Sequence, residues 1–102
     1  MDDNCIYVGT KPFMNYVTGV VMQFSTKGAD EVNIKARGKF ISTAVDIAEV
    51  SAKRFLDNTV AVKNIAIDSE EFTNKEGRQV RVSTIDITLK KQPQVSVNLE
   101  VA

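Results

Sequence analysis

Residues 31–37 read Glu31-Val32-Asn33-Ile34-Lys35-Ala36-Arg37. Apolar and polar side chains alternate strictly in this stretch, which predicts a β-strand with one buried and one solvent-exposed face. Gly38 ends the alternation, and apolar residues then recur at helical spacing, which predicts a helix over residues 40–56. The inner face of that helix is expected to carry Ile41, Val45, Ala48, Ala52 and Phe55.

A shorter strand and another helix are predicted on the N-terminal side. Residues 5–9 form a largely apolar run that ends at a glycine, which favours a short strand. Pro12 suits the first turn of a helix because its missing N–H is not needed there, so the predicted helix covers 12–26 and closes at Gly28. The inner face of this helix is expected to carry Phe13, Val17, Val20, Val21 and Phe24.

Two long strand patterns follow on the C-terminal side. The first begins at Val60, and its alternation slips by one residue between Val62 and Ile65, which predicts a β-bulge. The return strand runs to Leu89 and shows a second slip near Ser83. Both strands are therefore expected to be irregular rather than evenly pleated.

A polar stretch between these two strands predicts the tip of a hairpin. Residues 74–78 are all polar or glycine, and Gly77 is expected in a left-handed turn position. Few large apolar side chains lie between Asp68 and Arg81, so this part of the hairpin has little to bury. We therefore expect the hairpin to project beyond the sheet.

The order of the predicted elements indicates an α+β domain. It is a two-layer β-α-β-α-β-β sandwich, with two helices on one face of a mixed four-stranded sheet and a projecting hairpin between the last two strands. The domain is expected over residues 5–91, after a flexible N-terminus at residues 1–4. Residues 92–102 form an extension whose alternating apolar residues suit an extra strand.

The composition excludes several classes of protein. The chain has 102 residues, enough for one domain, with a single cysteine and no histidine. One cysteine fits a reducing cytosol, and no signal peptide or membrane-length apolar run is present, so we expect a cytoplasmic location. The lack of histidine removes the commonest general base and metal ligand, so no catalytic residue, metal or cofactor is predicted.

The arrangement of charges matters more than their sum, because the 13 basic and 13 acidic residues give a formal net charge of zero. Basic side chains are expected to point outward in three places: Lys11; Lys35, Arg37 and Lys39; and Lys75, Arg78 and Arg81. Each group is also compatible with an ordinary solvated surface. Glu70 and Glu71 lie on the same hairpin as the last group and oppose its charge.

Several segments, in order and nearly without gaps over residues 5–91, resemble the Alba family of archaeal chromatin proteins. They are Gly9-Thr10-Lys11-Pro12-Phe13-Met14-Asn15-Tyr16-Val17, Ile34-Lys35-Ala36-Arg37-Gly38-Lys39, Ile41-Ser42, Ala44-Val45-Asp46, Arg54-Phe55-Leu56, Gly77-Arg78-Gln79 and Arg81-Val82-Ser83-Thr84-Ile85. The resemblance implies a homodimer, associated with the chromosome, that binds duplex DNA and often RNA without strong sequence preference. The dimer body lies against the duplex, and the two hairpin arms reach along the minor groove.

The resemblance also implies roles for particular residues. Body contacts to phosphate fall on Lys11, Lys35, Arg37 and Lys39, with Asn15 and Tyr16 beside them, and arm contacts fall on Arg78 and Arg81. Local packing or capping is an equal reading for Tyr16. Phe55 matches the aromatic residue that joins one dimer to the next on DNA, although it can equally close the core at the end of its helix.

One departure from the family and three alternative functions follow. Many relatives have two lysines before the proline, whereas this chain has Thr10 in place of one of them, so Lys11 acts alone and weaker binding is expected. The alternatives are an RNA-binding protein or RNA chaperone that uses the same face, an enzyme with a phosphate site at Arg37 and Asn15, and an assembly protein that polymerises through Phe55 and the C-terminal strand.

Overall fold

The computed structural model describes residues 4–93. Its helices and strands follow the predicted order: β1 (Cys5–Tyr7), α1 (Phe13–Ser25), β2 (Glu31–Arg37), α2 (Ile41–Val50), β3 (Val60–Thr73) and β4 (Gln79–Lys91). A 3₁₀ turn (Gly38–Phe40) leads into α2, and a π-helical turn (Ser51–Phe55) extends it. Residues 1–3 and 94–102, which include most of the expected N-terminal and C-terminal extensions, lie outside the described residues.

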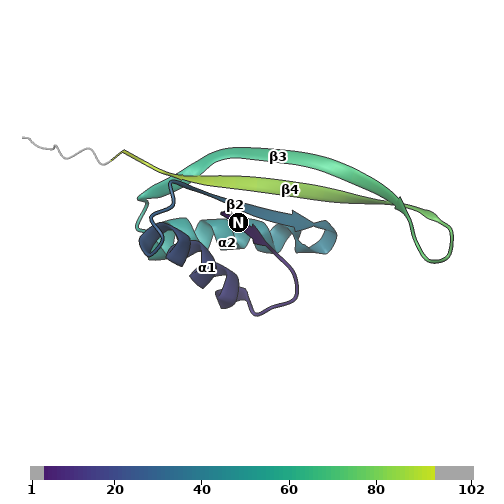
Figure 1. Ribbon diagram of the computed structural model, residues 1–102, viewed down its shortest axis with the longest axis horizontal. Coiled ribbons are helices and arrows are strands. Elements are labelled where there is room, and N and C mark those ends of the chain that lie inside the picture. Colours follow the sequence, from purple (N-terminus) through teal and green to yellow (C-terminus); the bar gives the residue numbers. More distant parts are fainter. Residues whose placement is uncertain (1–3, 94–102) are drawn as a thin grey trace, which may run out of the picture.

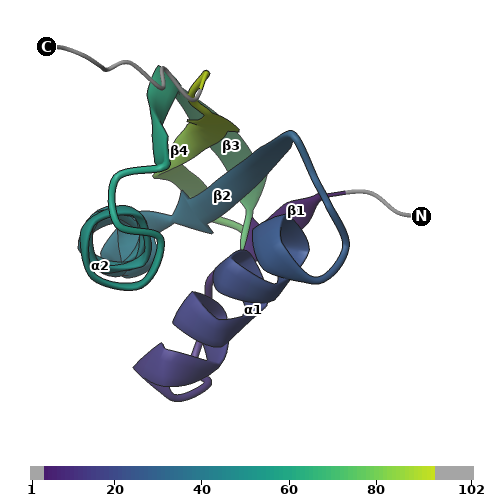
Figure 2. The same ribbon diagram turned by 90° about the vertical axis from the view of Figure 1, so that its left-hand side faces the viewer.

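The four strands form one mixed sheet in the order β1-β2-β4-β3. β1 runs parallel to β2, whereas the other two pairings are antiparallel. Both helices pack on one face of this sheet and leave the opposite face without a helix (Figures 1 and 2). The predicted α+β two-layer fold is confirmed. No helix in the described part of the chain is long and apolar enough to cross a membrane.

The strict alternation of β2 sets the two faces of the sheet. Val32, Ile34 and Ala36 are buried beneath the helices, while the residues between them point to the helix-free face. The register aligns Val32 and Ile34 with Leu89 and Ile87 of β4, and all four side chains are almost fully buried. This central pair of strands therefore forms the floor of the hydrophobic core.

Helix α1 closes the core as predicted, whereas α2 is rotated relative to its predicted inner face. The prediction that Val45 and Phe55 point inward is wrong, since their exposed fractions are 42% and 52%. Ala44 and Ile47 are buried instead, together with Ala48 and Ala52. More than half of the residues of α2 are apolar, so their spacing alone does not determine which side of the helix faces the sheet. The small alanine side chains on the buried side allow close packing.

The hairpin of β3 and β4 extends well beyond β2, as predicted (Figure 1). Pairing with β2 ends at Thr84 of β4, while pairing with β3 continues as far as Gln79. We call this two-stranded extension, residues 69–83, the arm. At its tip, the Asn74 side-chain carbonyl accepts hydrogen bonds from the backbone N–H groups of Glu76 and Arg78, and Gly77 has a φ of 82°.

One of the two predicted strand irregularities is present. The register shifts between Val62 and Asn64, which confirms the bulge in β3. The pairing passes through Ser83 without a shift, so the second predicted irregularity is wrong. The apolar pattern changes there for another reason: Val80 and Val82 belong to the arm, where no helix covers the sheet, and Val80 pairs with Phe72 on the helix-free face.

Candidate nucleic-acid interface

The alternation of β2 brings Lys35 and Arg37 to the helix-free face of the sheet. Both lie opposite the buried set of the same strand, and Arg37 stands at the strand's exposed end, beside the base of the arm. Lys39 follows in the 3₁₀ turn, where its ammonium lies 5.4 Å from the centroid of the Phe40 ring. These three cations therefore surround the point where the arm leaves the body.

Lys11 lies in the loop between β1 and α1, and Tyr16 holds this loop in place. The Tyr16 hydroxyl accepts hydrogen bonds from the backbone N–H groups of Gly9 (2.8 Å) and Lys11 (3.0 Å). The Tyr16 side chain is buried (7% exposed), so it orients the loop from within the core. Asn15 is exposed on the first turn of the same helix.

Removing the Tyr16 hydroxyl tests this positioning role. Tyr16→Phe leaves two partly buried N–H groups without their acceptor, so we expect the free energy of unfolding to fall by about 1–2 kcal/mol. Urea unfolding followed by circular dichroism measures this change. Thr18→Val, which deletes an exposed hydroxyl from the same helix, is the matched control; equal stability of the two variants would contradict the role.

Acidic side chains from neighbouring strands pair with three of the predicted phosphate-binding cations. Arg37 lies 3.1 Å from Glu70, and Lys35 lies 3.6 Å from Asp86. On the arm, Arg81 lies 3.4 Å from Glu71. Sequence reasoning missed these pairings, although aligning β3 with β4 places Glu71 directly opposite Arg81 and could have revealed that one.

Four other cations of this region have no acidic partner. Within residues 4–93, no salt bridge is formed by Lys11, Lys39, Lys75 or Arg78. Lys11 lies on the loop that Tyr16 holds, and Lys75 and Arg78 lie at the tip of the arm. The predicted surface therefore contains two kinds of cation: those that pair with a carboxylate, and those that pair with none in residues 4–93.

Basic residues at the other end of the sheet are engaged in structural ion pairs. Lys63 and Lys90 lie 2.7 Å from Glu31 and Asp30, respectively. The Lys90 ammonium donates a hydrogen bond to the Asp30 carboxylate and lowers the pKa of that carboxyl, and the hydrogen bond from Lys63 lowers the pKa of Glu31 in the same way. These lysines tie the start of β2 to β3 and β4.

The electrostatics around Lys35 favour its charged form. The pKa of Lys35 is raised, first by the electrostatic effect of the nearby Cys5 and then by the Asp86 carboxylate. Lys35 therefore remains an ammonium at any pH near neutrality. No cluster of three or more potential metal ligands of the His, Cys, Asp and Glu types occurs in the described residues.

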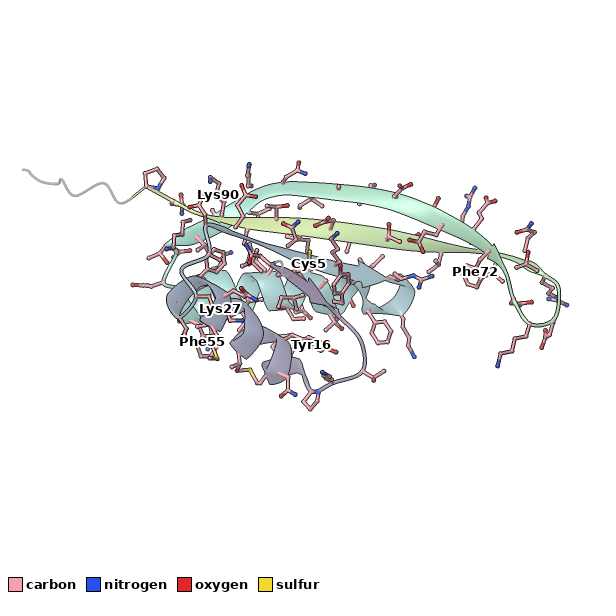
Figure 3. All side chains as sticks on the ribbon, in the orientation of Figure 1. Cys5, Tyr16, Lys27, Phe55, Phe72 and Lys90 are labelled. Carbon is pink, nitrogen blue, oxygen red and sulfur yellow. The ribbon has the colours of Figure 1, made fainter. Side chains whose placement is uncertain are left out.

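Two apolar surfaces lie outside the charged region. Phe55 is exposed near the end of the helical extension of α2, far from Phe72 and the arm (Figure 3). Along the outermost strand, Val62, Ile65 and Ile67 have exposed fractions of 44%, 55% and 79%. They align with the buried residues of β4, so they point to the helix side of the sheet at a strand that no helix covers. We call these three residues the β3 apolar edge.

Most of the chain is similar to proteins of one family. The family model for Alba matches residues 4–69. A "DNA/RNA-binding protein Alba" of Methanocella arvoryzae is 51% identical over 90 residues, which are 88% of this chain and 92% of the relative. Another of the same name, from Methanococcus maripaludis, is 46% identical over 89 residues, which are 87% and 99% of the two chains.

A solved structure agrees with these sequence matches. The structure described as Alba from Thermoplasma volcanium superposes with a TM-score of 0.79 at 44% sequence identity, and the match covers 86% of this chain and all of that one. On the family model, the sequence identities and the shared fold, this chain belongs to the Alba family.

Proposed function

We propose that this protein binds double-stranded DNA, largely independently of sequence, as a homodimeric chromosomal protein of the cytoplasm. The names of its relatives, which state DNA/RNA binding, support nucleic-acid binding in general. The observation that carries the proposal is the arm: a two-stranded ribbon that buries almost nothing and presents unpaired cations at its tip. The proposal includes no catalytic step and no cofactor.

In this proposal, the cations without acidic partners supply most of the binding energy. Lys11 and Lys39 contact phosphates from the body, and Arg78 contacts the duplex from an arm that follows the minor groove. Lys35, Arg37 and Arg81 add contacts once phosphate displaces their carboxylates. Asn15 is a neighbouring polar contact, and Tyr16 acts by positioning the Lys11 loop.

Dimer formation is proposed through the β3 apolar edge. Three large aliphatic side chains in a row on an outer strand form an exposed apolar surface of the kind that marks an interface. Association would cover these side chains and orient the two arms together. Contact between neighbouring dimers through the exposed Phe55 rings is proposed as a further step on DNA.

Salt titration tests the proposed function directly. Three of the cations without a carboxylate partner in the described residues, Lys11, Lys39 and Arg78, make six phosphate contacts in the proposed dimer. These contacts alone give a slope of about −5 in a plot of log affinity against log salt concentration, and contacts from Lys35, Arg37 and Arg81 would make it steeper. We would follow the anisotropy of labelled duplex DNA and duplex RNA of equal length at several salt concentrations. Tighter binding to RNA would move the function to RNA metabolism, since an A-form duplex differs in groove shape. No binding to either duplex at low salt would overturn the proposal.

The carboxylates beside the cations give a second test. Glu70→Gln frees Arg37 and removes a charge that repels phosphate, so we expect duplex DNA to bind about fivefold more tightly. Glu49→Gln is the matched control, because its carboxylate pairs with Lys53 within the helical region of α2. Equal affinities of the two variants in the anisotropy titration would show that Arg37 makes no phosphate contact.

A further inference from the structure

We propose that the helix-free face of the sheet holds a binding site for single-stranded nucleic acid, which two aromatic rings distinguish from the proposed duplex surface. The site is a stripe of four side chains, which we call the aromatic–cation stripe: Tyr7, Lys35, Arg37 and Phe72. Its ligand is an unpaired segment of DNA or RNA whose bases stack on the two rings. The stripe shares Lys35 and Arg37 with the proposed duplex surface, but it includes neither the Lys11 loop nor the arm tip.

The four side chains come from β1, β2 and β3, and β4 lies between the last two of these strands. Tyr7 of β1 aligns with Lys35 of β2, and the Lys35 ammonium lies 5.9 Å from the centroid of the Tyr7 ring. Arg37 is two residues further along β2, so it shares the same face. Its guanidinium carbon lies 5.9 Å from the centroid of the Phe72 ring, near the end of β3 on the arm. The stripe therefore has an aromatic ring at each end and a cation beside each ring.

The two rings are accessible and contribute little to the core. Tyr7 and Phe72 have exposed fractions of 66% and 43%, and the strand registers place both on the face of the sheet opposite to the helices. Single exposed apolar residues are ordinary on protein surfaces. Here each exposed aromatic ring lies beside a cation, and the two cations belong to the same strand, β2. Aromatic rings and cations together can stack bases and contact phosphates.

The shape of the surface suits an extended strand. Tyr7, Lys35, Arg37, Glu70, Val82 and Asp86 line one open pocket, and Phe72 lies outside it. Lys35 of β2 aligns with Asp86 of β4, which in turn aligns with Ala66 of β3. Ala66 therefore marks the level of Lys35 and Tyr7 on β3, and Phe72 lies six residues beyond it. At about 3.3 Å per residue, the rings are about 20 Å apart along the strand direction. An extended oligonucleotide spans this distance with several bases.

Base pairing decides which nucleic acid can use the stripe. The bases of a duplex are stacked on one another inside the helix, so they cannot lie flat on Tyr7 and Phe72. Unpaired bases can, and each stacked base contributes about 1–3 kcal/mol. Because Asp86 and Glu70 already neutralise Lys35 and Arg37, stacking rather than charge should dominate the affinity. Binding of a single strand should therefore depend less steeply on salt than binding of a duplex.

The test compares single-stranded and duplex probes on the same variants. We would measure the anisotropy of a labelled oligothymidine of about eight nucleotides and of a duplex DNA, each at several salt concentrations. Tyr7→Ala and Phe72→Ala are each expected to weaken single-strand binding about tenfold. Tyr7 lies in β1, outside both the arm and the Lys11 loop, so Tyr7→Ala is expected to change duplex binding less than twofold. Phe72→Tyr keeps an aromatic ring and should retain single-strand binding, and Met22→Ala removes an equally exposed apolar side chain elsewhere.

Each outcome separates this inference from the proposed function. Duplex binding without single-strand binding would overturn the stripe and leave the proposed function intact. Single-strand binding that is lost in Lys11→Ala but kept in Tyr7→Ala and Phe72→Ala would also overturn it, since the strand would then occupy the duplex surface. Single-strand binding that needs both rings, in a protein that fails to bind duplexes, would support the stripe and refute the proposed function.

Discussion

Replacing Ile67 with glutamate is expected to separate the proposed homodimer into single chains and to weaken duplex binding about 100-fold. Ile67 is the most exposed member of the β3 apolar edge, at 79%, so a charged side chain there is solvated in a single chain and leaves its fold intact. In a dimer the same carboxylate would be buried without a partner, which is strongly unfavourable. Loss of the second subunit removes half of the phosphate contacts and the avidity they provide.

Light scattering after size-exclusion chromatography measures the first effect, as a change from twice the chain mass of 11.3 kDa to that mass. Anisotropy with duplex DNA measures the second. Thr26→Glu adds the same charge at an exposed position beyond the end of α1 and should change neither mass nor affinity. An Ile67→Glu protein that keeps the mass of the unmodified protein would exclude the β3 apolar edge as the interface.

Lys11→Ala should produce the largest loss among the single cation substitutions. Lys11 has no acidic partner within residues 4–93, and Tyr16 fixes the loop that carries it. The substitution removes one phosphate contact from each subunit, so we expect the salt slope to become shallower by about 2 units. At low salt, the affinity for duplex DNA should fall about 10- to 100-fold.

Two lysine variants serve as comparisons in the same titration. Lys27→Ala removes an equal charge from the far end of α1 and should have little effect (Figure 3). Lys35→Ala should fall between the two, because Asp86 already offsets much of the Lys35 charge. If Lys35→Ala cost more than Lys11→Ala, the distinction between partnered and unpartnered cations would not govern binding.

The fold followed from the sequence wherever one face of an element is buried and the other is solvated. The alternation in β2 predicted where the strand begins and ends and which side chains are buried. A shift by one residue would expose Ile34 and bury Lys35, which is strongly unfavourable. The rotation of α2 did not follow, because Val45 and Ala44 are both apolar and only the packing against the sheet distinguishes them. The shift in the apolar alternation near Ser83 was likewise unpredictable, because it reflects the absence of a helix beneath the arm.

The candidate site was predictable in position but not in charge. The sequence places Lys35 and Arg37 on one face, and the structure has them there. Their neutralisation by Asp86 and Glu70 depends on side chains that reach across from other strands, which spacing along one strand cannot reveal. The stripe of rings is also a tertiary feature, since Tyr7 and Phe72 are 65 positions apart in the chain.

The contact between Arg37 and the arm has a mechanical consequence. Glu70 and Phe72 lie beyond the last residue pair that links β2 to β4, so this contact braces the arm against the body from across β4. A phosphate that binds the Arg37 guanidinium would break its contacts with Glu70 and Phe72 when the duplex binds. The arm would then gain freedom to bend about its base while its tip becomes anchored, and part of the entropy lost at the tip would be recovered at the hinge. Binding of phosphate by Arg37 would thus make the arm more flexible. The protein could then bind duplexes of different curvature with similar affinity.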